Sequence, residues 1–330
     1  MSLTIGMTYD LRRDYIALGY KEEDVAEFDA DITIDTIEAT IAQLGYTPER
    51  IGHARALCSR LAAGAHWDLV FNIAEGVAGR SREAQVPCML EAFNIPYTFS
   101  DPLVCAVTLD KAVAKRILQA QGLNTAGFHV VRSESDVDDV KLPFPLFAKP
   151  IAEGTGKGID RASRISNAAE LRGVCQMLLL KYSQPVLIEE YLPGREYTTA
   201  ILGTGADAKV LGTMEVCIRP NANTEIYTFE VKENYTHYVD YHIPPRTPET
   251  EAVETLALDA YRALELRDAG RVDIRLDAKG VPSFMEVNPL PGLNPHHSDL
   301  PIIAGLVGVS YKDIIGSIIT SAMNRIAVSP

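Results

Sequence analysis

The sequence has 330 residues and a formal net charge of −13 at pH 7. Hydrophobic residues make up 47% and charged residues 23%, which are ordinary values for soluble globular proteins, and the length suits two or three domains. The excess of acidic residues argues against nucleic acid as the main partner, because binding its phosphates requires a basic surface. No apolar run reaches the about 18 residues that span a membrane, so no membrane partner is expected.

The five cysteines are scattered and never form a C-x-x-C pair, so neither a disulfide framework nor a zinc ribbon is indicated. They are Cys58, Cys88, Cys105, Cys175 and Cys217. The first residues, Met1 to Gly6, lack the basic segment and the long apolar segment of a secretion signal. We therefore expect a protein of the reducing cytoplasm.

The first third of the chain has an α/β pattern. Apolar runs at residues 3–7 and 68–73 predict buried strands, and residues 33–44 have the spacing of an amphipathic helix. The loop 73–80 contains glycines, follows the second strand and precedes a helix that begins at Ser81. Ligands of open α/β sheets bind outside such strand ends, so this loop is a candidate part of a binding site.

The middle of the chain reads as a smaller unit built around a glycine-rich turn. Residues 108–118 have a helical pattern, and residues 128–131 form a predicted strand. A proline-punctuated strand at 143–150 leads into the loop Glu153-Gly154-Thr155-Gly156-Lys157-Gly158, and residues 167–181 form an amphipathic helix. Two strands around such a loop predict a lid-like hairpin.

The last part of the chain is expected to be a larger α+β unit, and we find no internal repeat. Strands are predicted at residues 186–190, 196–202, 210–216, 271–277 and 282–288, and a helix at residues 249–264. These patterns divide the chain into three domains, at residues 1–105, 106–185 and 186–330.

The two runs 271–277 and 282–288 flank a short turn and predict a β-hairpin that carries acidic residues. If Asp277 lies opposite Pro282, Asp273 lies opposite Glu286. Asn288 then shares their face, because side chains alternate along a strand. Carboxylate and amide oxygens suit Mg²⁺ that bridges ATP phosphates. Taken alone, an ordinary solvated hairpin is an equal alternative, at roughly one in two.

Two basic residues and the glycine loop accompany this hairpin. Arg271, two residues before Asp273, would point to the same side and could hold a developing anion. The loop 153–158 could cradle phosphates with its backbone N–H groups, although it matches neither a Walker A nor a Rossmann loop. Lys149 lies in an apolar strand, where a cation needs a partner such as a phosphate. A flexible surface turn is the alternative for the loop.

The strand 186–192 ends in two carboxylates, Glu189 and Glu190. Such a strand end could present backbone groups to an adenine edge and a carboxylate to ribose hydroxyls. The alternative is an ordinary junction between a strand and a turn. The order in which these signals follow one another is more informative than any one of them.

That order resembles the ATP-grasp superfamily, and within it the D-alanine:D-alanine ligase family, over nearly the whole chain. The matching segments are Asp110-Lys111, Lys149 with the glycine loop, Ile188-Glu189-Glu190-Tyr191-Leu192, Arg271-Val272-Asp273 and Glu286-Val287-Asn288. Residues 83–91, 95–98 and 288–293 are also similar to segments of that family.

The resemblance implies an ATP-grasp fold of mixed α/β and α+β class, with a Rossmann-like N-terminal domain and with ATP held between the central and C-terminal domains. By this resemblance, ATP contacts fall on Lys111, Lys149, Glu153, Gly154, Gly156, Glu189, Glu190, Tyr191, Leu192, Glu196 and Lys232. Magnesium, or manganese in its place, would be bound by Asp273, Glu286 and Asn288. The implied catalytic residues are Arg271, Thr155 and Gly292, the last through its backbone.

The implied reaction joins a carboxylate to an amine. In the family, the first substrate's carboxylate takes the γ-phosphoryl group of ATP. The second substrate's amine then attacks the acylphosphate, which yields an amide, ADP and phosphate. Phosphorylation creates a good leaving group, and cations offset the charge that develops. The resemblance also implies small-molecule substrates such as amino acids, a homodimer formed through the N-terminal domain, and a place in cell wall biogenesis.

The substrate end departs from the family pattern. The family's glutamate after the first strand, which holds an ammonium group, is missing from residues 7–13, and Glu75-Gly76 stands where the family commonly has His-Gly. Thr155 and Glu233 replace a serine and a tyrosine, and His297 replaces the serine that binds the acceptor carboxylate. The identity of the substrates therefore does not follow from the resemblance.

Several residues at these positions are candidates for substrate contact. Glu75 could bind an ammonium group, and Arg80 or Arg82 a carboxylate, for which arginine has bidentate geometry. His297 and Ser298 are further candidates. The alternative, at roughly one in three, is that Glu75 caps its loop and that the arginines are solvated.

Three other functions stay open: a natural-product dipeptide or cyclising ligase, a carboxylase-like ATP-grasp enzyme, and a catalytically silent nucleotide-binding regulator. Lys149, Arg271, Asp273, Glu286 and Asn288 are all present. This set argues against the regulator, because a protein that only binds a nucleotide has less need of both metal ligands and an oxyanion arginine.

Overall fold

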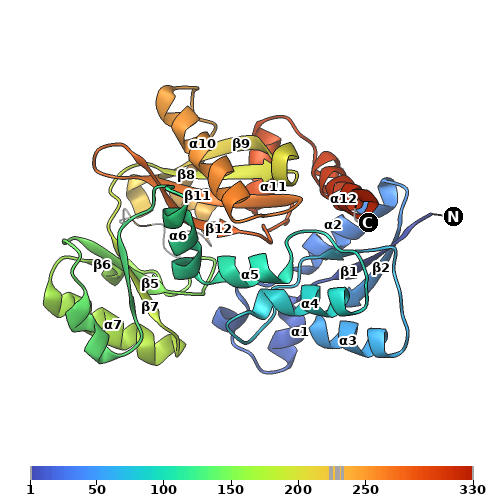
Figure 1. Cartoon of the computed structure of the whole chain (residues 1–330), viewed down its shortest axis with the longest axis horizontal. Helices are drawn as coiled ribbons and strands as arrows, with labels where there is room; N and C mark the ends of the chain where they lie inside the picture. Colours follow the sequence, from blue (N-terminus) through green and yellow to red (C-terminus); the bar gives the residue numbers. More distant parts are fainter. Residues whose placement is uncertain (1, 223–225, 227–230, 232–233, 329–330) are drawn as a thin grey trace.

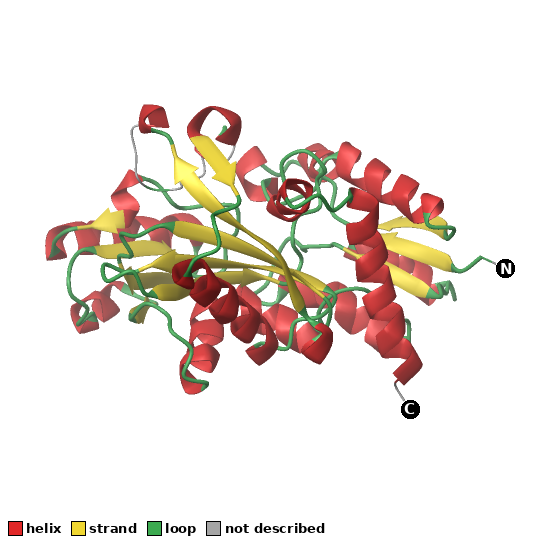
Figure 2. Ribbon diagram, turned by 90° about the horizontal axis from the view of Figure 1, so that it is seen from above, coloured by secondary structure: helices red, strands yellow, loops and turns green. Residues whose placement is uncertain are grey.

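The structure is a computed structural model that describes residues 2–222, 226, 231 and 234–328 (Figure 1). The N-terminal sheet lies at one end of the molecule and the central sheet at the other, and the C-terminal sheet lies above the central sheet and extends toward the middle (Figure 1). Helices lie against the sheets (Figure 2). The mixed α/β arrangement agrees with the expected fold class.

The N-terminal sheet is parallel, with strand order β2-β1-β3. Its strands are β1 (Thr4–Thr8), β2 (Thr47–Gly52) and β3 (Leu69–Asn72), and its helices include α1 (Arg12–Ala17), α2 (Asp31–Gln43), α3 (Ala54–Ala62) and α4 (Gln85–Ala92). All four residues of β3 are buried, which explains its continuous apolar run. Parallel strands joined by helices are the Rossmann-like arrangement that we expected.

The C-terminal helix α12 (Tyr311–Val328) packs against this N-terminal unit. Ile34, Ile37 and Ile41 of α2 follow the helical spacing and share one core with Ile314 and Ile318 of α12. Figure 1 shows the two helices side by side near the C-terminus. The last helix therefore ties the two ends of the chain together.

The helix expected at residues 108–118 is in fact two helices, α5 (Pro102–Leu109) and α6 (Lys111–Ala120). Asp110 separates them with an extended backbone, and its carboxylate accepts a hydrogen bond from the N–H of Val113. The prediction of one continuous helix is wrong, because an aspartate favours this N-cap geometry.

The central sheet is antiparallel, with strand order β4-β7-β5-β6. Its elements are β4 (Phe128–Val131), β5 (Leu146–Pro150), β6 (Arg164–Ile165), β7 (Val186–Glu190) and the helix α7 (Ala168–Tyr182). Strands β5 and β6 form the expected hairpin around the glycine loop. Strand β7 lies after the domain boundary expected at 185/186, yet it pairs with β4 and β5, which lie before that boundary. The domain boundaries themselves stay predictions.

The C-terminal sheet has strand order β10-β9-β8-β11-β12. Its strands are β8 (Glu196–Leu202), β9 (Lys209–Ile218), β10 (Val239–His242), β11 (Ala269–Leu276) and β12 (Pro282–Asn288), and its helices are α9 (Tyr235–Tyr238), α10 (Pro248–Ala263) and α11 (Asp299–Leu306). Helix α10 covers one face, where it packs on Tyr197 and Val272. Helix α11 covers the other face, beside Ala200 and Met214.

Among the described helices, no single one is long and apolar enough to cross a membrane, and only the sharply bent pair α11 and α12 passes a test of length and composition.

Candidate active site

The hairpin β11–β12 brings the three predicted metal ligands together. Asp273 lies opposite Glu286, as expected, and Asn288 lies opposite Arg271. The assumed partner of Pro282 was Asp277, however, and the structure pairs Pro282 with Leu276. A bulge beside Asp273 shifts the register by one residue and restores the expected pairing further along the strands.

Two lysines approach Glu286 from the central domain. The Nζ atom of Lys111 lies 3.5 Å from Glu286 Oε2, and that of Lys149 lies 3.9 Å from the same atom. Lys111 also donates a hydrogen bond of 2.7 Å to the backbone oxygen of Glu153 at the start of the glycine loop. Both lysines are buried, so they hold positive charge directly beside the predicted metal ligands.

A third buried lysine, Lys115, belongs to this cluster and was missed by the sequence analysis. Its Nζ atom lies 2.6 Å from Glu189 Oε1, while Lys149 lies 3.0 Å from Glu189 Oε2. Lys115 also donates hydrogen bonds to Thr125 Oγ1 and to the backbone oxygen of Phe284 in β12. The signal in the sequence was a lysine four residues after Lys111, on the buried face of a helix.

The pKa values in this cluster follow from burial and from the balance of charge. Burial alone would raise the pKa of Glu189, but Lys115 and Lys149 outweigh it and lower that pKa. Burial lowers the pKa of Lys115 despite its contact with Glu189. Burial acts on Lys149 too, but Glu189 and Glu286 together raise its pKa. Lys149 is therefore held as a cation beside Glu286.

Arg271 is held between two carboxylates. Its guanidinium pairs with Asp299 through Nη1 and with Asp273 Oδ2 at 3.0 Å through Nη2. Burial alone would lower the pKa of Arg271. The carboxylates of Asp273 and Asp299 outweigh burial, so the pKa lies above its usual value. Within the described structure, its buried Nε has no hydrogen-bond partner. Asp299 stands at the start of α11 and was also missed, because an acidic residue there reads as an ordinary first-turn residue.

The glycine loop lies over this hairpin. Gly156 lines a cavity of about 70 Å³ together with Lys149, Asp273 and Glu286. Thr155 has a left-handed backbone, with φ of 50°, and its buried hydroxyl has no hydrogen-bond partner among the described atoms. A strained loop residue with an orphaned hydroxyl is an arrangement found where ligands bind.

The remaining part of the loop contacts both its own domain and the N-terminal part of the chain. The Glu153 carboxylate pairs with Lys157 at 2.9 Å and accepts a hydrogen bond from Gln184. The N–H of Gly154 donates to Glu27. A Cβ atom at Gly154 would lie 2.8 Å from that carboxylate, so a larger residue there would force the Glu27 side chain to move.

The strand end predicted to hold adenine and ribose is ordered by contacts within the protein. The N–H of Glu190 donates to the backbone oxygen of Gly127 at 2.9 Å. Tyr191 stacks on Phe147, and Leu192 follows it, partly buried. Glu196 accepts a hydrogen bond of 3.2 Å from Arg275. Lys232 and Glu233 lie outside the described residues.

A second cavity, of about 210 Å³, continues from the hairpin toward the N-terminal domain. Residues from all three parts of the chain line it, including Glu75, Arg82, Thr155, Arg271, Asn288, Gly292, His297 and Ser298. Gly292 approaches Ser298 so closely that a Cβ atom would lie 2.7 Å from the Ser298 hydroxyl. The structure thus brings most of the predicted catalytic and substrate residues to one cavity.

Arg80 is the exception among the substrate candidates. It does not line this cavity, its side chain is 76% exposed, and it pairs with Asp110 at 2.7 Å. Arg82 does line the cavity, but it is held by Glu27 at 2.6 Å and by the backbone oxygen of Ala152. Arg80 therefore lies outside this cavity, and its role as a substrate contact stays a prediction.

The cavity is rich in carboxylates near Glu75. Burial, together with Glu83 and Glu27, raises the pKa of Glu75 well above its usual range. Burial also raises the pKa of Glu83. Asp10, in the segment between β1 and α1, accepts hydrogen bonds from the N–H of Gly76 and from the hydroxyl of Tyr15, so it braces the loop. Glu27, which the sequence analysis missed, lines the same cavity as Glu75, although it lies 48 residues earlier in the chain.

Comparison with known proteins identifies the family. A family model described as the D-ala D-ala ligase C-terminus matches residues 117–320. A D-alanine–D-alanine ligase of Bordetella petrii is 35% identical over 276 residues, which cover 82% of this chain and 80% of that protein. One of Marinomonas sp. is 31% identical and covers 79% of each chain. The uncharacterized protein y4sG of Sinorhizobium fredii is 34% identical over 78% of this chain.

A solved structure shows the same fold. The D-alanine–D-alanine ligase of Bacillus anthracis, crystallised with ATP, matches with a TM-score of 0.74 at 22% identity and covers 98% of each chain. The sequence matches cover both the central and C-terminal parts, and the sequence prediction of an ATP-grasp fold is confirmed. This chain belongs to the D-alanine–D-alanine ligase family and is an ATP-dependent ligase that forms carbon–nitrogen bonds.

Proposed function

We propose that this protein joins the carboxylate of one amino acid to the amine of a second through an acylphosphate, with Mg²⁺ and ATP bound between the central and C-terminal sheets. The observation that carries the proposal is the approach of Lys111 and Lys149 to Glu286, directly opposite Asp273. Buried cations on one side and carboxylates on the other match the charges of a nucleotide's phosphates and its metal.

The residues present fit a magnesium ion. Asp273, Glu286 and Asn288 offer oxygen donors from one face of a hairpin, and hard oxygen donors are what Mg²⁺ prefers. The buried amide nitrogen of Asn288 has no hydrogen-bond partner in the described part of the chain, so its side chain is free to turn its oxygen inward. When bound, the ion would neutralise phosphate charge and orient the γ-phosphoryl group.

The chain's own residues account for the remaining steps. Lys149 and Lys111 bind phosphate oxygens and orient ATP, and the glycine loop excludes water above them. Arg271 faces the 210 Å³ cavity beside Gly292, where a guanidinium and a backbone N–H can stabilise the oxyanion that forms as the amine attacks. The tetrahedral intermediate then expels phosphate as its C–O bond breaks, the attacking nitrogen loses a proton to solvent, and the amide remains.

The carboxylates near Glu75 support an ammonium-bearing first substrate. Glu75 and Glu27 both line the cavity, and a substrate ammonium would relieve the repulsion between them. The named relatives are D-alanine–D-alanine ligases, so D-alanine is the first candidate. A cytoplasmic location and a homodimer belong to the same proposal, and all five cysteines are unpaired, as in reducing compartments.

Release of ADP tests this function. Purified protein with MgATP is supplied with single D- and L-amino acids and with pairs of them. We expect ADP release that depends on the amino acids and a dipeptide that mass spectrometry detects. Glu286→Gln should abolish release at ordinary Mg²⁺ concentrations and recover part of it when Mg²⁺ is raised. The absence of amino-acid-dependent release across the panel would favour a nucleotide-binding regulator.

A further inference from the structure

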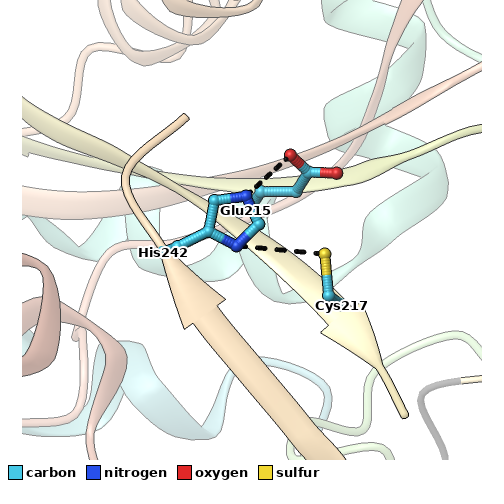
Figure 3. A group of neighbouring side chains, drawn as sticks. All are labelled: Glu215, Cys217 and His242. Atoms are coloured by element: carbon cyan, nitrogen blue, oxygen red, sulfur yellow. Dashed lines mark hydrogen bonds and ion pairs between the residues drawn. The ribbon is translucent and has the colours of Figure 1, made fainter. Parts of the chain in front are cut away.

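Three side chains that can bind a metal meet at the edge of the C-terminal sheet, away from the proposed magnesium site (Figure 3). Glu215 and Cys217 lie on β9, two residues apart, and therefore point to the same face. His242 lies on the edge strand β10, directly opposite Glu215. Two neighbouring antiparallel strands thus bring a carboxylate, a thiol and an imidazole together.

The distances place these groups around one point. His242 Nε2 lies 3.2 Å from Glu215 Oε2, and His242 Nδ1 lies 4.0 Å from Cys217 Sγ. One ligand atom from each residue can be chosen so that all three lie within 4.8 Å of one another. Tetrahedral zinc would separate a nitrogen from an oxygen by about 3.3 Å and a nitrogen from a sulfur by about 3.6 Å. The imidazole need only turn to direct one nitrogen at the shared ion.

We propose that Glu215, Cys217 and His242 form a binding site for a transition-metal dication of the Zn²⁺ class, with water completing the tetrahedron. Thiolate and imidazole ligands select such ions over Mg²⁺, which prefers oxygen. The site therefore differs in metal preference from Asp273, Glu286 and Asn288, and it does not depend on the proposed reaction.

The charges around the site favour a cation. The thiolate and the carboxylate carry two negative charges when the metal is bound. Arg195 Nη1 lies 3.5 Å from Glu215 and opposes the ion, but Arg195 is half exposed and also pairs with Glu249, toward which it can turn. Glu215 is buried, whereas His242 is about half exposed, so an ion can enter from solvent. A thiol binds such an ion only as the thiolate, so binding should release the proton of Cys217.

The position of the site suggests a structural role. His242 is the last residue of β10, and its neighbour Tyr241 faces the opposite side, where it lines the 210 Å³ cavity. Tyr241 stacks on Tyr235, whose hydroxyl donates to the backbone oxygen of His296. An ion that joins β10 to β9 would therefore hold this wall of the cavity in place.

Zinc titration of the full chain tests the site. The protein is freed of metal with a chelator and then titrated with Zn²⁺ in excess Mg²⁺, against a chromogenic competitor. We expect a single tight Zn²⁺ per chain and a proton released on binding. Cys217→Ser and His242→Asn should each weaken binding at least about ten-fold, since even outer-shell changes have effects of that size. Cys58→Ser, which removes an exposed thiol on α3, is the matched control and should bind as the unaltered chain does.

Two further measurements separate a real site from adventitious binding. Co²⁺ in place of Zn²⁺ should give a sulfur-to-cobalt absorption band that Cys217→Ser abolishes and Cys58→Ser retains. Zn²⁺ should also slow amide hydrogen exchange at residues 239–242. The proposal is overturned if the unaltered chain takes up no Zn²⁺ at micromolar concentration, or if the Cys217 and Cys58 variants bind it equally.

Discussion

Lys115 and Glu189 form a buried ion pair of 2.6 Å that joins helix α6 to strand β7. Lys115 also donates to the backbone oxygen of Phe284, two residues before Glu286 in β12. One lysine therefore links the strand that carries Glu189 to the hairpin that carries the proposed metal ligands. We assign Lys115 the role of a positioning residue, because its ammonium group is wholly enclosed by protein.

Replacing Lys115 should destabilise the protein strongly. Lys115→Met leaves Glu189 buried with only Lys149 as its cationic partner, and breaking a buried pair costs about 3 kcal/mol or more. The free energy of unfolding in urea measures this loss. The matched control is Lys181→Met, which breaks the half-exposed pair with Glu23 and should cost less than about 1 kcal/mol. Equal losses in the two variants would argue against a special role for Lys115.

A second prediction concerns the arginine between Asp273 and Asp299. Arg271→Lys keeps the charge but loses the two-pronged contact, and we expect kcat to fall by about 10²–10³-fold, as when an oxyanion donor is removed. Asp299→Asn should lower kcat by a smaller factor and leave KM for ATP unchanged. This change removes the ion pair that orients the guanidinium of Arg271 but leaves the guanidinium itself in place. Steady-state ADP release measures both, with the exposed Arg246→Lys as control. An unchanged kcat for Arg271→Lys would remove it from the proposed chemistry.

The pairing of Asp273 with Glu286 could be predicted from the sequence because it depends on local rules. Strands alternate, a short turn connects them, and β12 has the bounds that its apolar pattern indicated. The turn is one residue longer than we assumed, so the predicted pairing of Asp277 with Pro282 is wrong. The bulge beside Asp273 shifts the register back by one residue, so the predicted pairing of Asp273 with Glu286 is right. Strand alternation and turn length both assume an unbroken register, so they do not locate that bulge.

The residues that the sequence analysis missed come from segments that only tertiary packing brings together. Glu27 reaches Arg82 across 55 positions, and Asp299 reaches Arg271 across 28. Neither acid stands at a spacing that marks it as functional. Arg80 and Arg82 illustrate the same limit. Arg80 ends the glycine-bearing loop and Arg82 stands two residues further on, but of the two only Arg82 lines the 210 Å³ cavity.

A third prediction tests the ammonium site. Glu75→Gln removes a carboxyl group that a substrate ammonium would draw into its ionised form, and a lost charge-assisted hydrogen bond corresponds to about a 10–100-fold rise in KM for the ammonium-bearing substrate. KM for ATP should not change, because Glu75 belongs to the N-terminal part of the chain and the proposed ATP contacts all lie after residue 105. Kinetics with each substrate varied in turn measure the two constants. Glu134→Gln, on an exposed turn, is the control, and an unchanged KM for both amino acids would contradict the assignment.

The last prediction concerns pH and stability. Burial raises the pKa of Glu83 to about 7, and one of its carboxylate oxygens has no hydrogen-bond partner among the described residues. Its pKa in the unfolded chain is near 4.5, so between these two values the folded state binds a proton that the unfolded state does not. Stability from this group is therefore fully present below the unfolded value and is lost as pH rises through the folded value.

The difference between the unaltered chain and Glu83→Gln isolates this effect from the other carboxylates. Glutamine stays neutral at every pH, so the variant should be more stable relative to the unaltered chain at pH 8 than at pH 5. Urea unfolding at both pH values measures the two differences in free energy. A difference that does not change with pH would mean that Glu83 is ionised in the folded protein throughout, and that Arg82 neutralises it despite its burial.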